Sequence, residues 1–155
     1  QKDVPDADWR FSENKGDRSC DVPKGGKEIT DRILNPLKLP GNIRLFRYTE
    51  HNGRMYVDEE TCPEELKWKA KNTIKELNLN APRLMRMRKA VIDKLTDELM
   101  LALAEGQGFD ETLEWLAESF LLPDHKNRSI PFFTVIRWYL GEAAEKLIAN
   151  SGTKL

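Results

Sequence analysis

The chain has 155 residues, a net charge of −1 from 25 Lys and Arg against 26 Asp and Glu, and a hydrophobic fraction of 39%. This length allows one domain to bury enough surface to fold without a disulfide or a metal. The near balance of charge argues against both a generally basic nucleic-acid binder and an acidic disordered tail. Any electrostatic function must therefore come from local clusters. The longest apolar stretch, 130–140, is interrupted by Thr134 and Arg137 and is too short to span a membrane.

Residues 1–26 are rich in Pro, Gly and charged side chains and show no periodicity, which predicts an extended or partly ordered N-terminal arm. Trp9 and Phe11 lie two residues apart in this arm. Aromatic side chains in a polar arm predict that it docks on its own domain or on a partner. The rest is expected to be one helical domain, 27–150, followed by a loose tail, 151–155.

The chain begins with Gln1 rather than Met, which indicates a processed product, a fragment or a chain whose start has been removed. Cys20 and Cys62 form no C-x-x-C pair and are interpreted as two reduced thiols, because a disulfide would require an oxidising compartment. The N-x-S sequon at 127–129 has the form suited to such a compartment. We expect a soluble protein, with a cytoplasmic location slightly favoured and a processed or secreted chain left open.

The first elements of the domain are a short helix and a β-hairpin. The apolar spacing predicts a helix over 27–34, ended by Pro36 because the residue before a proline avoids the helical region. Asn52-Gly53 lies between two strand-like segments and predicts a hairpin at 43–58 with a two-residue turn. That turn would pair Tyr48 with Val57 and Arg47 with Asp58. One apolar face results and should lie on the helical body or join a third strand; it carries Phe46, Tyr48, Met55 and Val57.

The remainder of the chain reads as helix. Apolar residues recur at helical spacing over 61–77, 83–105, 110–122 and 129–149. Thr61 to Glu64 has the form of a capping box, and Asp110 is a favourable N-cap. The fold class is therefore predicted as mainly α (α+β): a bundle of about four helices with one β-hairpin and the extended N-terminal arm.

Signatures of catalysis are absent from the sequence, which has no phosphate-binding glycine loop, H-E-x-x-H, G-x-S-x-G or C-x-x-C. His51 and His125 are interpreted as residues of solvated turns and loops. A zinc site built from them with Cys20 and Cys62 has the right ligand types but no supporting spacing. We expect no enzyme, cofactor or metal, although a site assembled from residues distant in sequence stays open.

The strongest local charge signal is basic. Nine Lys and Arg lie between residues 67 and 94, against Glu76 and Asp93. This segment indicates a solvated or internally paired face, or a surface for an anionic partner such as a nucleic-acid backbone. The residues that would carry nucleic-acid binding are Lys67, Trp68, Lys71, Arg83, Arg86, Arg88 and Lys89.

The favoured hypothesis is a non-enzymatic protein-interaction or structural module, working as a subunit or fragment within a larger assembly. The aromatic arm and the highly apolar last helix indicate a protein partner or self-association through Trp9, Phe11, Phe133 and Trp138. Exposed apolar surface around Trp115, Trp138 or Phe133 would support this hypothesis. Nucleic-acid binding through 67–94 is the alternative.

Overall fold

A computed structural model describes residues 13–20, 23, 25–39, 43–122 and 131–151. Within them the chain forms five α-helices and one two-stranded antiparallel sheet, which confirms the predicted fold class of a mainly helical protein with a β-hairpin. Two short 3-10 turns, η2 (Lys15–Asp17) and η3 (Pro36–Lys38), come before the hairpin. The remaining elements are β1 (Phe46–Tyr48), β2 (Met55–Val57), α1 (Glu64–Glu76), α2 (Pro82–Ala104), α3 (Phe109–Leu121), α4 (Phe133–Leu140) and α5 (Glu142–Ser151).

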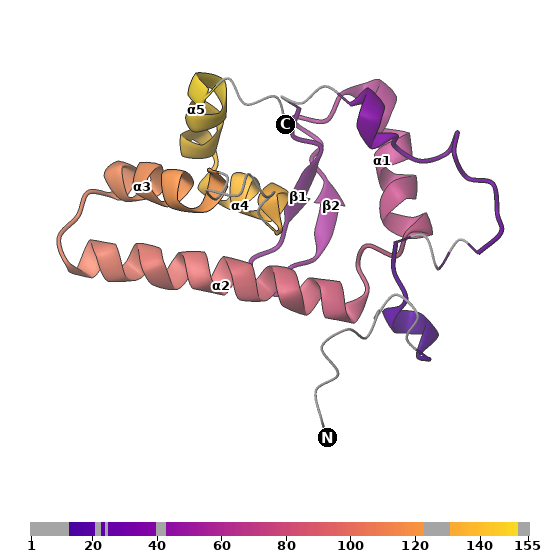
Figure 1. Cartoon of the computed structure of the whole chain (residues 1–155), viewed down its shortest axis with the longest axis horizontal. Helices are drawn as coiled ribbons and strands as arrows, with labels where there is room; N and C mark the ends of the chain where they lie inside the picture. The colour runs from indigo at the N-terminus through magenta and orange to yellow at the C-terminus, as the bar shows by residue number, and fades with distance from the viewer. Residues whose placement is uncertain (1–12, 21–22, 24, 40–42, 123–130, 152–155) are drawn as a thin grey trace.

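The long helix α2 runs along one side of the molecule, and the other elements pack on it or on one another (Figure 1). Helix α3 folds back on α2, and α4 contacts both of these helices. The hairpin lies between α4, which contacts β1, and α1, which contacts β2. Helix α1 is thus joined to the other helices through the hairpin rather than through a helical bundle.

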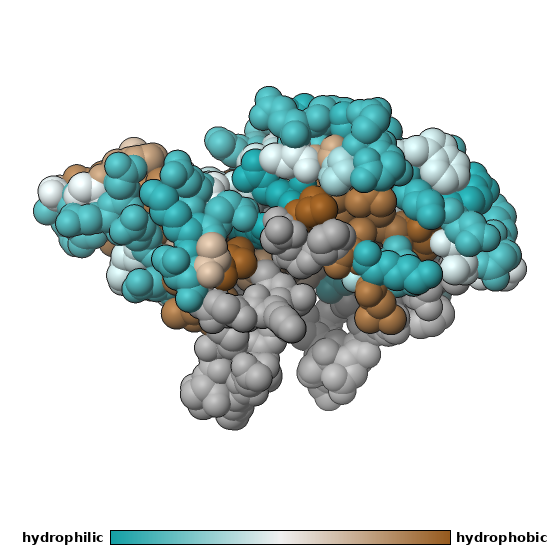
Figure 2. All heavy atoms as spheres, turned by 90° about the horizontal axis from the view of Figure 1, so that it is seen from above, coloured by the Kyte–Doolittle hydropathy of each residue, from teal (hydrophilic) through white to brown (hydrophobic). Residues whose placement is uncertain are grey.

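Two packed regions make up the core. In the first, α2, α3, α4 and α5 enclose a cluster in which Leu95, Leu116 and Leu140 are at most 1% exposed. In the second, Leu34, Val57 and Ala70 bring the hairpin together with α1. Tyr48, Met55, Ile92 and Val135 form the contact between the two regions. Figure 2 shows hydrophilic residues over most of the face seen from above, with hydrophobic residues gathered in its middle.

The hairpin has the predicted apolar face but not the predicted register. Arg47 lies opposite Tyr56, and Tyr48 lies opposite Met55, which corrects the expected pairs by two residues. The loop is longer than two residues because Thr49 closes it: the Arg54 N–H donates to Thr49 Oγ1 (3.2 Å), and Thr49 N–H donates to the carbonyl of Arg54 (3.0 Å). A slip of two residues keeps every side chain on its face, so the buried set is unchanged.

The hairpin lies on the helical body, which is one of the two arrangements expected from the sequence. The amide of Asn80, just before α2, takes the place of a third strand: its Oδ1 accepts from Met55 N–H (2.8 Å) and its Nδ2 donates to Met55 O (2.9 Å). Gly53 packs directly on α2. A Cβ at this position would lie 2.3 Å from Met85 O and 2.7 Å from Lys89 N, so only glycine fits.

Two predictions of local structure are wrong because tertiary contacts outweigh them. The predicted helix 27–34 is a single turn, and the Leu34 N–H donates to Thr73 Oγ1 of α1 (2.9 Å) rather than to its own turn. The predicted capping box is not formed. Thr61 Oγ1 donates instead to Arg44 O (2.6 Å), and α1 begins at Glu64 without a side-chain cap. A third prediction, of Asp110 as an N-cap, is also wrong: α3 has Gly108 at its N-cap, and Asp110 lies in its first turn.

The predicted last helix, 129–149, is two helices within the described residues. Gly141 breaks it with φ +54°, a conformation that other residues rarely adopt. The break lets α5 turn against α3, and Arg137 joins the two pieces. Its Nε and Nη2 donate to Glu145 Oε1 (2.8 Å) and Oε2 (2.7 Å). Because Arg137 is only 6% exposed, this bidentate pair fixes the angle between α4 and α5.

Part of the predicted N-terminal arm docks on the end of α1. The Cys20 N–H donates to Leu77 O (2.8 Å), and Asn78 Nδ2 donates to Gly16 O (3.0 Å) and Arg18 O (2.7 Å). The aromatic pair of the arm, Trp9 and Phe11, lies outside the described residues.

Candidate functional site

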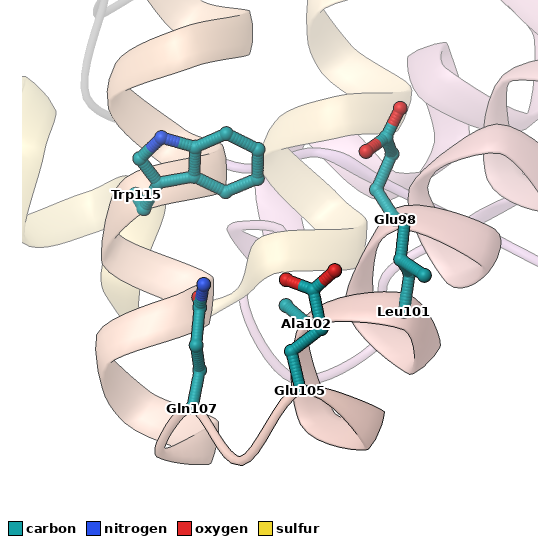
Figure 3. A pocket seen from close by; sticks show the side chains of 6 residues that line it. All are labelled: Glu98, Leu101, Ala102, Glu105, Gln107 and Trp115. Atoms are coloured by element: carbon teal, nitrogen blue, oxygen red, sulfur yellow. The ribbon is translucent and has the colours of Figure 1, made fainter.

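A cleft of about 240 Å³ opens where the C-terminal end of α2 meets α3. Trp115 of α3 forms one wall, and its indole faces the α2 side chains of Glu98, Leu101 and Glu105 on the other (Figure 3). The α2 residues recur at intervals of three and four, so they share one helix face. The residues that line the cleft are Glu98, Leu101, Ala102, Glu105, Gln107 and Trp115.

The turn between α2 and α3 holds the two walls in place. Gly106 has φ +87°, and its N–H donates to Leu103 O (3.1 Å) while the Gln107 N–H donates to Ala102 O (3.0 Å). These two bonds form a Schellman motif, which places Gln107 beside Ala102 at the end of the cleft. Thr112, which is fully buried, fixes the start of α3 by donating to Gly108 O (2.8 Å). The cleft is therefore built on a defined turn.

Large apolar side chains are exposed at this cleft. Leu101 is 58% exposed and Trp115 is 49% exposed, although the inner faces of both helices are well buried. Hydrophobic side chains scattered singly over a surface need no explanation, whereas Leu101 and Trp115 line one cleft. The sequence indicated Trp115 as a candidate for exposed apolar surface and missed Leu101. The signal that could have found it is its spacing: Leu101 follows Glu98 by three residues and precedes Glu105 by four, so it lies on a charged helix face.

Acidic side chains surround this apolar cleft. Residues 95–122 contain seven Asp and Glu and no Lys, Arg or His. Within the described part of the chain, none of the seven forms an ion pair. Glu111 and Glu118 lie one turn to either side of Trp115 on α3, and Glu98 and Glu105 lie on the facing wall. The cleft thus combines exposed apolar side chains with neighbouring carboxylates.

The basic segment 67–94 is partly neutralised by the fold. Lys67 and Lys71 both form ion pairs with Glu59 (3.3 and 3.0 Å), and the pKa of Glu59 lies below its usual value because these lysines donate to it. Lys67 also pairs with Glu64 (2.7 Å). Lys89 donates to both carboxylate oxygens of Asp93 (2.7 Å each).

The other candidate residues of the basic segment lie in different settings. Arg86 and Trp68 are exposed, Trp68 by 58%, whereas Arg83 is half-buried. Arg88 is only 5% exposed, and its guanidinium lies 5.7 Å from the Tyr48 ring and 3.5 Å from Gly53 O. Burial lowers the pKa of Arg88 from its usual value. A side chain enclosed in this way supports the hairpin and is not placed to meet a phosphate.

The partner-binding residues of the last predicted helix are half-buried. Phe133 packs on the core formed by α2, α3 and α5, and Trp138 packs on the hairpin, edge-to-face with Tyr48 at 5.6 Å between ring centroids. The structure therefore does not bring Phe133 together with Trp115, and it leaves Trp138 in a separate hollow beside the hairpin.

The groups considered for catalysis or metal binding do not form a site within the described residues. His51 is exposed in the hairpin loop and contacts Asn52, and His125 lies outside the described residues. Cys62 is buried, and burial raises the pKa of its thiol. No group of three or more His, Cys, Asp or Glu within the described ranges is placed to hold a metal ion. None of the helices described is long and apolar enough to cross a membrane.

No protein-family model, curated protein or solved structure matches the chain. The function must therefore be argued from the site itself.

Proposed function

We propose that this chain is a non-enzymatic protein-interaction module and that the cleft between α2 and α3 binds a basic amphipathic helix of a partner protein. The observation that carries the proposal is the pairing of exposed Leu101 and Trp115 with a rim of carboxylates that form no ion pair among the described residues. The chain would then work as a subunit within a larger assembly.

The side chains of the cleft indicate which class of partner it would bind. Tryptophan is the side chain most often found to dominate binding energy in interfaces, especially where neighbouring contacts exclude water. A helix that presents apolar side chains at i, i+3 and i+4 can place them against Trp115 and Leu101. Lys and Arg on the flanks of that helix would pair with Glu98, Glu105 and Glu111. These glutamates also attract a basic partner at long range and so raise the association rate.

Titration calorimetry with a synthetic amphipathic peptide, leucine on one face and lysine on the other, tests the proposal. We expect it to bind, and a scrambled peptide of the same composition to bind much more weakly. Trp115→Ala should lower affinity by about thirtyfold, as expected for a central aromatic contact. Glu105→Gln with Glu111→Gln should lower it chiefly at low salt, because salt screens exposed charges.

Matched variants outside the cleft test whether the peptide binds at the cleft rather than elsewhere on the surface. Trp68→Ala removes another exposed tryptophan, and Glu64→Gln with Glu142→Gln removes two exposed carboxylates from other helices. Both should leave affinity unchanged. Equal losses in these controls, or equal binding of the scrambled peptide, would contradict the proposal. Concentration-dependent light scattering that disappears with Trp115→Ala would instead identify a second copy of the chain as the occupant.

A further inference from the structure

A second hollow lies on the exposed face of the hairpin, remote in sequence from the α2–α3 cleft. It consists of two adjoining pockets of about 280 and 390 Å³ that share Arg47 and Tyr56 in their walls. The first extends to Lys71 and Lys75 of α1, and the second extends to Trp138 of α4. We call the two together the hairpin trough.

Positive charge dominates the hairpin trough. Its walls carry four cations, Arg47, Arg54, Lys71 and Lys75, against the single carboxylate of Glu59. Glu59 pairs with Lys71 at 3.0 Å. Arg47, Arg54 and Lys75 form no ion pair with any residue that the structure describes. Three cations, two on the hairpin and one on α1, are thus left to face an external anion.

Aromatic rings occupy the middle and one end of the trough. Tyr56 is 40% exposed, and the Arg54 guanidinium lies 5.6 Å from the centre of its ring. Trp138 is held edge-to-face against Tyr48, with an interplanar angle of 67°. The strand that carries Tyr56 is fixed on its buried side by Met55 and Val57, so the trough is preformed rather than assembled by a ligand.

We propose that the hairpin trough binds single-stranded nucleic acid. Arg47, Arg54 and Lys75 would contact phosphates, and Tyr56 and Trp138 would stack on bases. A duplex has its bases already stacked and offers none to these rings, and an acidic peptide would leave both aromatic surfaces unused. This site overlaps the basic segment 67–94 at Lys71 and Lys75, and its arginines and aromatic rings come from the hairpin and from α4.

Fluorescence anisotropy with labelled single-stranded DNA and RNA of about 12 nucleotides tests the proposal, since such sites span ~4–16 nucleotides. Three phosphate contacts predict a slope of about −2 for log affinity against log salt. Arg47→Ala with Arg54→Ala should lower affinity by about tenfold or more at low salt and bring the slope to about −0.7. Tyr56→Ala should lower affinity about five- to hundredfold, whereas Tyr56→Phe retains the ring and should keep binding.

The charge-matched control is Arg86→Ala with Lys146→Ala, which removes two exposed cations outside the trough and should leave affinity and salt slope unchanged. Circular dichroism melts check that each variant is folded, and we expect all of them to be, because the substituted positions are exposed. Absence of binding at about 50 mM salt, equal loss in the control, or equally tight duplex binding overturns the proposal. Displacement of the oligonucleotide by polyglutamate at the same concentration of charge would assign the trough to acidic peptides and overturn it as well.

Discussion

Two consecutive stretches of this chain have opposite charge and equal magnitude. Residues 67–94 hold nine basic and two acidic side chains, a net of +7, and residues 95–122 hold seven acidic side chains and no basic ones, a net of −7. The boundary falls in the middle of α2. The overall charge of −1 conceals this separation, which shows that net charge is a poor guide to what a surface can bind.

The charged side chains of the two stretches differ in how many have ion-pair partners within the fold. In the basic stretch Lys67 and Lys71 are paired with Glu59, Lys89 is paired with Asp93, and Arg88 is buried. In the acidic stretch no carboxylate has an ion-pair partner among the described residues. The fold thus uses at least four of the nine basic side chains in internal contacts, and it leaves all seven carboxylates of the acidic stretch without an ion pair among the described residues.

The largest expected effect separates a hairpin glycine that packs on the basic stretch, Gly53, from the turn glycine of the acidic stretch, Gly106. Gly53→Ala should destabilise the protein by about 3 kcal/mol or more, because the new Cβ would overlap the backbone of α2. Gly106→Ala, in the acidic region, has the same kind of positive φ but nothing within 4 Å, so it should cost only about 1 kcal/mol. Urea unfolding measures both. Equal losses would show that backbone conformation, rather than the contact between hairpin and helix, determines the cost.

An intermediate effect is expected from Asp58, a buried carboxylate beside the basic region. Burial raises its pKa, but hydrogen bonds from the Glu60 and Thr61 N–H groups and the charge of Arg44, 3.3 Å away, outweigh burial and leave the pKa below its usual value. A lowered pKa in the folded state contributes stability that is present at neutral pH and lost as the pH falls. Asp58→Asn should therefore cost about 1 kcal/mol at pH 7.

The pH dependence of stability tests whether ionisation of Asp58 is linked to folding. The stability difference between the wild type and Asp58→Asn should narrow as the pH falls below about 4, the ordinary range of an Asp pKa. Asp97→Asn, at an exposed position in the acidic stretch, is the matched control and should leave the unfolding curve at pH 7 nearly unchanged. A constant difference for Asp58→Asn across the whole acid range would show that its ionisation is not linked to folding.

The smallest expected effect is a gain in stability. Glu114 and Glu118 are exposed like charges four residues apart on α3, an arrangement that destabilises a helix slightly. Glu118→Lys should replace this repulsion by attraction and stabilise the protein by about 0.5 kcal/mol, with the gain falling at high salt. Thermal melting at low and high salt measures it. A loss of stability would contradict the prediction and show that Glu118 makes a favourable interaction. Because Glu118 lies near the cleft, the same substitution should also weaken binding of the basic peptide.

Local sequence features predicted the helices α1, α2 and α3 to within three residues at each end, and the apolar face of the hairpin. Their periodicities are strong, and burial of the apolar face is the largest stabilising contribution in each case. The sequence also located the basic segment and named Trp115 as a candidate for exposed apolar surface. Sequence alone did not predict the cleft, since Leu101 and Trp115 meet only because the Gly106 turn folds α3 back on α2.

Tertiary structure decided the features that depend on distant partners. Residues 27–34 do not form the predicted helix, because the Leu34 N–H donates to Thr73 of α1. The hairpin register depends on the hydrogen bond between Arg54 and Thr49 and on the close packing of Gly53 against α2. Arg88 became a buried support because Tyr48 and Gly53 surround it. The physical reason is that periodicity determines which face of an element is buried, whereas pairing of charges and polar groups depends on which other elements that face meets. The sequence by itself therefore determined the elements and their charges, and the packing decided which of those charges remain free to bind.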